Sequence, residues 1–288
     1  MENSNDNIEK VYKEFVTISN YFEAGNNGQL TVNPKYANLI HNYCDYGDKS
    51  GKGNCSDHFQ MVSSGVINLL KDLKNKYHLE DDKLAEYAIL WLCYILKLYL
   101  KDKLTNLSKF YTNHIEKNKC YNDKIKDDGL TYKEIIDKKI DLMNINEIFK
   151  LEAPFNILYY LYNVIHDEHP DCDTNLEFAK KFADQFKDLN NDSNNTVGSS
   201  YSQILSTLSN DYEILKNKYG NKCSNFPSIP PLSPKKNSEK LSVDISGSSA
   251  EEISLPTPEA TPSSSSTLNT VIPVLSTFAI PVFLGVAY

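Results

Sequence analysis

Residues 84–100 read LAEYAILWLCYILKLYL, a stretch that is apolar on nearly every side of a helix. Its uncharged part, between Glu86 and Lys97, holds only ten residues, too few to cross the roughly 30 Å hydrocarbon core of a bilayer. A helix that is apolar all round has to be covered by other elements. We therefore expect residues 84–100 to form the central buried helix of a bundle.

Several other segments repeat apolar residues at helical spacing, and they can cover this central helix. Apolar residues recur every three or four positions from Ile8 to Ile18, for example. Thr131 followed by Glu134 is typical of a capping box at the start of a helix. No segment alternates apolar and polar residues convincingly, so we expect little or no sheet and an all-α, multi-helix bundle. The expected helices cover residues 8–18, 34–40, 59–77, 84–100, 104–120, 131–143, 146–167, 174–189 and 201–215, the last closing at Gly220.

Composition divides the chain into three regions. Helical periodicity covers residues 1–225, the expected ectodomain. Residues 226–268 are rich in Pro and Ser, which predicts an extended, mobile, disordered linker without a core. Residues 269–288 carry no charge, and the 18 residues from Val271 onward approach the length of a membrane helix, which favours a C-terminal transmembrane segment. The alternative for this last segment is a buried terminal helix or a strand pair of a soluble fold.

The two ends of the chain differ in character. The N-terminal sequence MENSNDNIEKVYKEF has neither a basic start nor an apolar core, so it does not resemble a cleavable signal peptide. No basic cluster follows the apolar segment, although such a cluster usually fixes the orientation of a membrane helix. We expect either that the sequence is truncated after Tyr288 or that a later coding segment completes it.

The charge of the chain argues against several classes of function. The net charge is −8, and all 30 basic residues are Lys, whereas Arg is the preferred contact to phosphate and guanine. We therefore expect no nucleic-acid partner. Gly occurs only 11 times, and the loop with Gly47, Gly51, Lys52 and Gly53 departs from the phosphate-binding pattern in its spacing. Since no HExxH, GxSxG or paired-acid signature occurs, we expect no enzyme, no cofactor and no small-molecule substrate.

Two His and two Cys flank a short polar loop. They are His41, Cys44, Cys55 and His58, and paired ligands of these types could bind zinc. The spacing matches no strong zinc pattern, however, and a Cys44–Cys55 disulfide closing the loop is favoured over zinc and over two free thiols. Another candidate metal loop is the acidic run between residues 166 and 173, where a solvated connection between helices is the better interpretation.

The four other cysteines divide into two groups. Cys172 lies among acidic residues, which do not favour a reactive thiolate, so a disulfide to Cys223 or Cys120 is expected. Cys93 lies in the apolar helix beside Trp91, and we expect it to be a free thiol in the core. The sequence therefore predicts no metal site and no catalytic residue.

Short motifs occur in a recognisable order along essentially the whole chain. They are Tyr43-Cys44, Trp91-Leu92-Cys93-Tyr94, Lys109-Phe110-Tyr111, Ile135 to Lys139 with Asp141 to Asn144, Phe149-Lys150, Ser202 to Tyr212, and Phe283 to Tyr288. This set resembles the PIR (Plasmodium interspersed repeat) variant proteins, of the YIR/BIR/CIR type found in rodent malaria parasites. Two departures stand out, because relatives usually carry Cys at the positions of Tyr12 and Tyr159. Their joint replacement suggests that the two cysteines form one disulfide in relatives.

The resemblance implies a membrane-anchored variant antigen, exported to or displayed on the infected red cell, with roles in immune evasion and host-cell interaction. It implies a host red-cell or immune receptor as partner, and the lipid bilayer as a second partner through residues 269–288. We expect recognition to use the polar surface loops at residues 45–57 and 190–200. The alternative is an intracellular, vesicle-associated protein with a trafficking or scaffolding role.

Overall fold

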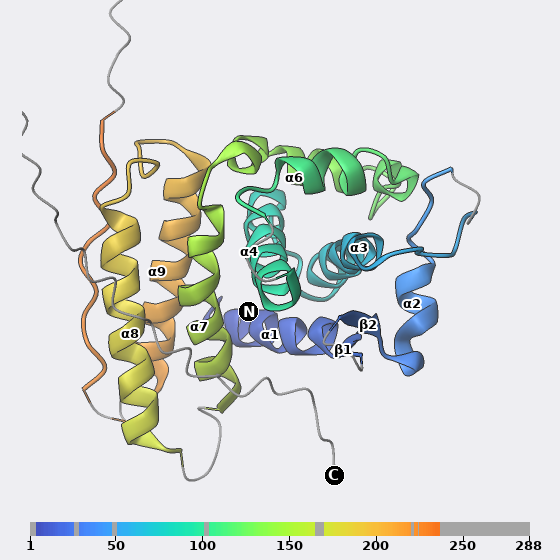
Figure 1. Ribbon diagram of the computed structural model, residues 1–288. Coiled ribbons are helices and arrows are strands. Elements are labelled where there is room, and N and C mark those ends of the chain that lie inside the picture. Colours follow the sequence, from blue (N-terminus) through green and yellow to red (C-terminus); the bar gives the residue numbers. More distant parts are fainter. Residues whose placement is uncertain are drawn as a thin grey trace, which may run out of the picture. The chain divides into compact units, whose positions relative to one another are not determined.

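The structure is a computed structural model that describes residues 4–25, 29–47, 51–100, 104–164, 170–219, 222–223 and 225–236. Residues Met1–Asn237 form one compact unit, and the account below concerns that unit (Figure 1). The apolar segment at residues 269–288 and residues 237–268 of the Pro/Ser-rich linker lie outside the described residues, as does the expected helix end at Gly220.

The described part is built mostly from helices. The α-helices are α1 (Ser4–Ser19), α2 (Ala37–His41), α3 (His58–Tyr77), α4 (Asp81–Leu100), α5 (Ser108–Phe110), α6 (Tyr132–Asp137), α7 (Glu152–Val164), α8 (Cys172–Asn190) and α9 (Ser200–Tyr219). Between them lie the short 3-10 helices η1 (Pro34–Tyr36), η3 (Lys119–Asn122), η4 (Ile140–Asn144) and η5 (Ile148–Leu151), and the π-helix η2 (Tyr111–Ile115). The strands β1 (Phe22–Ala24) and β2 (Leu30–Val32) form an antiparallel pair in which Phe22 faces Val32.

Helix α4 is the centre of the bundle, as its apolar sequence predicts. It contacts α3, α6, α7 and α9. Every side chain from Leu84 to Leu96 is buried, and the Trp91 ring is fully buried. The prediction of a central buried helix is confirmed.

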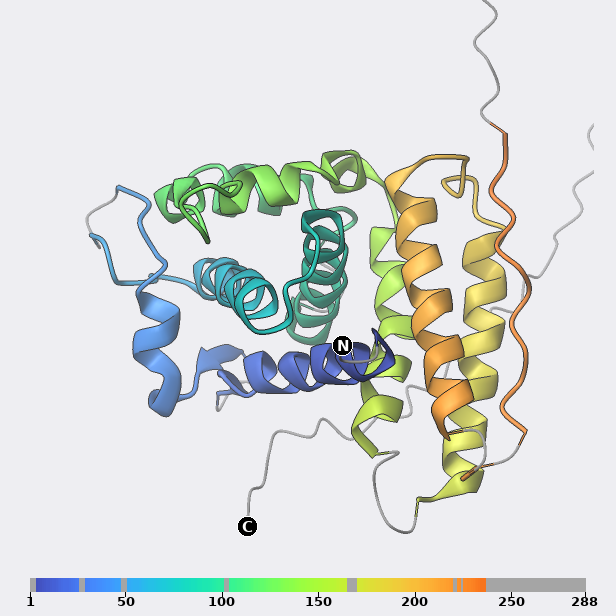
Figure 2. The same ribbon diagram turned by 180° about the vertical axis from the view of Figure 1, so that it is seen from behind.

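Two groups of helices cover α4. On one side α7, α8 and α9 lie side by side, and α7 also contacts α1 (Figure 1). On the other side α1 and α3 pack against each other, and α2 packs on α3. The view from behind shows α2 at the opposite end of the unit from α8 and α9 (Figure 2).

The small β-hairpin packs closely against α3 at one glycine, Gly65. A Cβ atom at Gly65 would lie 2.8 Å from the Trp91 ring and 2.9 Å from the Phe22 ring, closer than side chains normally approach. Gly65 therefore allows the strand residue Phe22 and the central Trp91 to pack directly on the backbone of α3. The hairpin is the sheet that the described residues contain, in line with the expectation of little sheet.

Four expected helices are divided into shorter pieces. Residues 104–120 form α5, η2 and part of η3, and residues 131–143 form α6 followed by η4. Residues 34–40 form η1 and most of α2, and the expected helix at 146–167 contains η5 followed by α7. One reason is Asn118, whose side-chain oxygen accepts a hydrogen bond from Cys120 N and starts a new helix there. The capping box is confirmed: Thr131 Oγ1 accepts from Glu134 N at 3.1 Å, and Glu134 Oε2 accepts from Thr131 N at 2.8 Å.

The compact unit extends past residue 225, the expected end of the helical domain. Residues 226–236 run in an extended form along α8 and α9 (Figure 1). Phe226 is only 6% exposed, and Ile229 and Leu232 pack against the core. The expectation of a mobile linker starting at 226 is wrong for these residues. A Pro-rich segment can dock in this way because Pro has no N–H group to satisfy, and its carbonyl groups accept hydrogen bonds from Tyr212 and Asn190.

Candidate functional site

A disulfide closes the first of the two loops that the sequence singled out. Cys44 and Cys55 are joined, and both are buried, while residues 51–54 are exposed. Gly53 N donates to Cys44 O at 2.9 Å, and Cys55 N donates to His41 Nδ1 at 3.0 Å. The loop is therefore a short polar surface on a rigid base.

The base of this loop rests on a buried asparagine. Asn118 is 1% exposed; its Nδ2 donates to Tyr43 O at 2.7 Å, and its Oδ1 accepts from Asp45 N at 3.1 Å. Lys119 N also donates to Asp45 O at 2.8 Å. These bonds use backbone groups of the loop, so they place it without fixing its exposed side chains.

The four residues weighed as zinc ligands do not form a coordination set. Both sulfur atoms are in the disulfide, and His41 Nδ1 accepts the hydrogen bond from Cys55. His58 is directed into an aromatic cluster, with its ring centroid 4.2 Å from that of Phe59. Among the described residues, no group of three or more His, Cys, Asp or Glu is placed to hold a metal ion.

The aromatic cluster at His58 also contains a second histidine. His114 stacks on Phe59 at 5.2 Å and faces Tyr46 at 6.2 Å. His58 Nε2 and His114 Nδ1 are both buried without a hydrogen-bond partner in the described part of the chain. Burial lowers the pKa of His114, and the neighbouring Asp57 opposes this shift.

The remaining cysteines lie in two kinds of environment. Cys172 and Cys223 are joined by a disulfide that ties the start of α8 to the segment after α9. Cys93 and Cys120 are buried thiols, and burial raises the pKa of both. A raised pKa keeps a thiol protonated at neutral pH, so neither has the character of a nucleophile.

The acidic loop before α8 is described only from Pro170 onward. Asp171 is the N-cap of α8 and accepts from Thr174 N at 3.1 Å, which lowers the pKa of Asp171. Residues 165–169, including His166 and His169, lie outside the described residues.

The second loop, at residues 190–200, is held largely by its own hydrogen bonds. Asn195 is fully buried, and its Nδ2 donates to Asn190 O at 2.8 Å. Ser199 Oγ donates to Thr196 O at 2.9 Å. Val197 is 55% exposed and is the main apolar side chain offered to solvent here. The 190–200 loop, expected to be a polar surface loop, is therefore more tightly held than residues 51–54 and also exposes an apolar side chain.

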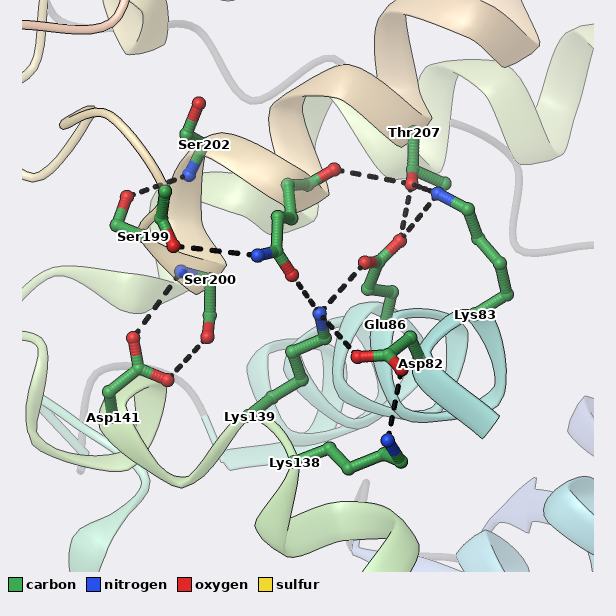
Figure 3. A network of polar contacts seen from close by, with 12 residues as sticks. Asp82, Lys83, Glu86, Lys138, Lys139, Asp141, Ser199, Ser200, Ser202 and Thr207 are labelled. Atoms are coloured by element: carbon green, nitrogen blue, oxygen red, sulfur yellow. Dashed lines mark hydrogen bonds and ion pairs between the residues drawn. The ribbon is translucent and has the colours of Figure 1, made fainter. Parts of the chain in front are cut away.

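Two of the motifs that carry the family resemblance meet at a buried lysine (Figure 3). Lys139 is 1% exposed, and its Nζ lies 3.1 Å from Glu86 Oε1 and 3.3 Å from Asp82 Oδ1. Nζ also donates to Gln203 Oε1 on α9. One lysine thus joins α4 and α9 to the turn after α6.

The carboxylate of Glu86 has further partners on its other oxygen. Glu86 is 3% exposed at its side chain; Oε2 accepts from Lys83 Nζ at 2.8 Å and from Thr207 Oγ1 (Figure 3). Next to this group, Asp141 accepts hydrogen bonds from the hydroxyl and the backbone N–H of Ser200. A buried charge cluster is stable only when its members satisfy each other, and here they do.

A second buried carboxylate lies farther along α9. Asp211 is fully buried, and its carboxylate accepts from Tyr12 OH and Tyr87 OH, both at 3.0 Å. Burial raises the pKa of Asp211 to about 7, although these hydrogen bonds act in the opposite direction. Tyr162 OH donates to Asp211 O at 2.7 Å, and its ring stacks on Tyr12 at 4.3 Å. The position of Tyr12 on α1 therefore faces α7, the helix that also carries Tyr159.

These buried groups were not predicted from the sequence. The available signal was the isolation of two acids: Glu86 within the apolar run of α4, and Asp211 between apolar residues of α9. A charge on an otherwise apolar helix face predicts a buried partner. Lys139, Glu86 and Asp211 are buried and paired with neighbouring groups, so these residues support the fold.

The fold and these sites define a class: a disulfide-stapled helical domain with structural charge clusters inside and polar loops outside. Within the described residues, no helix is long and apolar enough to span a membrane. A family model for the Plasmodium variant antigen protein Cir/Yir/Bir matches residues 12–288, so the chain belongs to the Cir/Yir/Bir variant antigen family.

A solved structure supports the same assignment. The chain is similar to a Plasmodium PIR protein ectodomain, with 32% identity and a TM-score of 0.56, over 81% of this chain and 99% of that one. A comparison with curated proteins gives no match.

Proposed function

We propose that the chain is a membrane-anchored variant antigen, displayed on or exported into the infected host red cell, whose helical domain contacts host molecules. The observation that carries the proposal is the contrast between buried motif residues such as Lys139 and the exposed, disulfide-closed loop at residues 51–54. Surface residues can change without loss of the fold when the residues that specify the fold are inside. Family membership supports a surface or exported location.

The two disulfides support a location outside reducing compartments. Disulfides persist in oxidising environments and are rare in the cytosol. Cys44–Cys55 and Cys172–Cys223 together use four of the six cysteines. The proposal involves binding and no catalysis, with residues 1–237 as the binding domain and the apolar residues 269–288 as the anchor.

The proposal is tested by labelling the protein in infected red cells. An impermeant amine-reactive biotin reagent should label exposed lysines such as Lys52 on intact cells, and an impermeant thiol reagent without reductant should leave Cys44 and Cys55 unlabelled. Extraction at alkaline pH should leave the protein in the membrane fraction. Ready labelling of both cysteines would contradict an oxidised domain and favour the vesicle-associated alternative. Biotin labelling only after the cells are lysed would contradict display on the surface.

A further inference from the structure

The segment after α9 is fastened to the domain along its whole described length. We call residues 226–236 the strap. Just before the strap, a disulfide joins Cys223 to Cys172, the first residue of α8, and at its start Tyr212 OH donates to Pro227 O at 2.8 Å. Phe226 is buried there.

In its middle, the strap is held by one asparagine that binds its backbone at two points. Asn190 is 6% exposed; its Nδ2 donates to Pro231 O at 2.9 Å and its Oδ1 accepts from Ser233 N at 2.9 Å. A carboxamide that both donates to and accepts from a peptide backbone recognises an extended chain without regard to its side chains.

At its far end, the strap joins the 190–200 loop by a short parallel β-bridge. Lys235 N donates to Asn195 O at 2.8 Å, and Val197 N donates to Lys235 O at 2.9 Å. Lys235 Nζ donates to Asn191 O at 2.8 Å. The strap therefore returns along α9 and ends beside the start of that helix, on the side of the unit away from α2 (Figures 1 and 2).

We propose that the strap is a clasp that passes tension from the C-terminal segment into α8 and α9 together. This role depends on the proposed anchor at residues 269–288. A pull along the strap loads the bonds at Pro227, Pro231, Ser233 and Lys235 in shear, so they share the force.

Behind these bonds the Cys172–Cys223 disulfide carries the force to the start of α8. Without it, the force would reach the last turn of α9 alone, and that helix holds Gln203, Thr207 and Asp211 in the buried clusters. The strap also covers one side of the 190–200 loop. We therefore assign contact with a partner to the loop at residues 51–54.

The attachment of the strap is tested by hydrogen exchange on the full-length chain in detergent. Asn190→Asp keeps the acceptor for Ser233 N but replaces the donor to Pro231 O with a carboxylate oxygen, which repels the carbonyl. We expect the amides of Ser233 and Lys235 to exchange about tenfold faster or more, with exchange in α4 unchanged. Asn191→Asp, the same change at an exposed neighbour, should leave the strap protected. Equal exchange in the two variants, or an unprotected strap in the unaltered protein, would overturn the proposal.

The load-bearing role is tested by pulling the full-length chain from its two ends in optical tweezers. We expect the force that unfolds α9 to fall by about a third or more in Cys172→Ser/Cys223→Ser. The matched Cys44→Ser/Cys55→Ser variant, which loses a comparable stability away from the strap, should show a clearly smaller fall. An unchanged force in the first variant would refute the clasp. Both experiments are independent of membrane insertion, so a failure of the anchor would appear in the alkaline extraction and not here.

Discussion

Two regions of the domain, which we call the α4–α9 junction and the loop end, use polar residues in opposite ways. The junction contains Lys139, Glu86 and Asp211, which are buried and whose charged groups all have partners. The loop end contains residues 43–57 with η2 and η3; its exposed polar side chains lie above a base held by backbone bonds and a disulfide. At the junction each buried side chain has to be of its present type, because its neighbours need it as a hydrogen-bond or ion-pair partner. At the loop end the backbone path is required and the exposed side chains are free to differ.

The largest expected effect on stability is at Lys139, and the neighbouring Lys138 provides a matched control. Lys139→Met removes the cation between Glu86 and Asp82 and leaves Glu86 buried with less compensation, which should lower the free energy of unfolding by about 3–5 kcal/mol. Lys138→Met removes only a partly exposed ion pair to Asp82, and should cost under about 1 kcal/mol. Urea unfolding followed by circular dichroism measures both. Equal losses would mean that the junction is no more specific than the surface.

The two disulfides should differ in how much they stabilise the domain. Cys172–Cys223 spans a sequence separation of 51 and Cys44–Cys55 one of 11. Loop-closure entropy then predicts a loss of about 4 kcal/mol for the Cys172→Ser/Cys223→Ser pair and about 3 kcal/mol for Cys44→Ser/Cys55→Ser. Thermal unfolding of the two double variants gives the order. A greater loss for the short loop would show that the loop end depends on its disulfide for more than chain entropy.

The junction should lose stability as the pH rises. Asp211 has a pKa of about 7 in the folded protein, above its ordinary value near 3.8, so the folded state keeps a proton that the unfolded chain releases. Its contribution is full below about pH 4 and is lost as the pH rises through 7. Asp211→Asn should reduce the fall in unfolding free energy between pH 5 and pH 8 by about 2 kcal/mol.

The control for this change is the exposed acid Asp127. A second buried acid, Glu152, also lowers the stability of the domain as the pH rises. Asp127→Asn should leave the pH dependence as it is. Burial also raises the pKa of Glu152 to about 7, so part of the fall should persist in Asp211→Asn. A profile identical to that of the unaltered protein would show that Asp211 is ionised throughout.

The smallest expected effect has the opposite sign and lies at the loop end. The pKa of His114 is below its ordinary 6.5, because burial disfavours the charged ring. Its contribution to stability is present above pH 6.5 and is lost as the pH falls through the folded value. His114→Phe should make the unfolding free energy less sensitive to acid by under about 1 kcal/mol between pH 7 and pH 5. The surface change Lys126→Gln serves as the control, and a matching response from it would assign the effect to general charge.

The sequence predicted the helices with continuous apolar faces and failed where side chains interrupt them. Helix α4 and the Thr131 capping box were found because their signals are local. The sequence predicted one helix over residues 104–120, and the break in it was missed because Asn118 caps a new helix inside the expected one. The docked strap was missed because a Pro-rich composition indicates only that a segment is extended, and docking depends on Asn190 and Tyr212, which come earlier in the chain.

The candidate sites followed the same division. The spacing of Cys44 and Cys55 favoured a disulfide, and the structure joins them. For Cys172 the sequence left two partners open, and the structure has Cys223. The Lys139 cluster could not be derived, because its members come from three segments between residues 82 and 207 that only the tertiary fold brings together. An isolated acid in an apolar helix indicates that a partner is needed, but this signal was not used, and it does not say which residue the partner is.

The hydrogen bond from Tyr12 to Asp211 joins residues 199 positions apart. At about 5–20 residues per second, a ribosome needs roughly 10–40 s to make the chain between them. During that time the hydroxyl groups of Tyr12 and Tyr87 have no Asp211 to accept their hydrogen bonds, and the centre of the domain cannot be completed. The domain can therefore complete its folding only after its last helix has been made, and the nascent chain needs protection from aggregation until then.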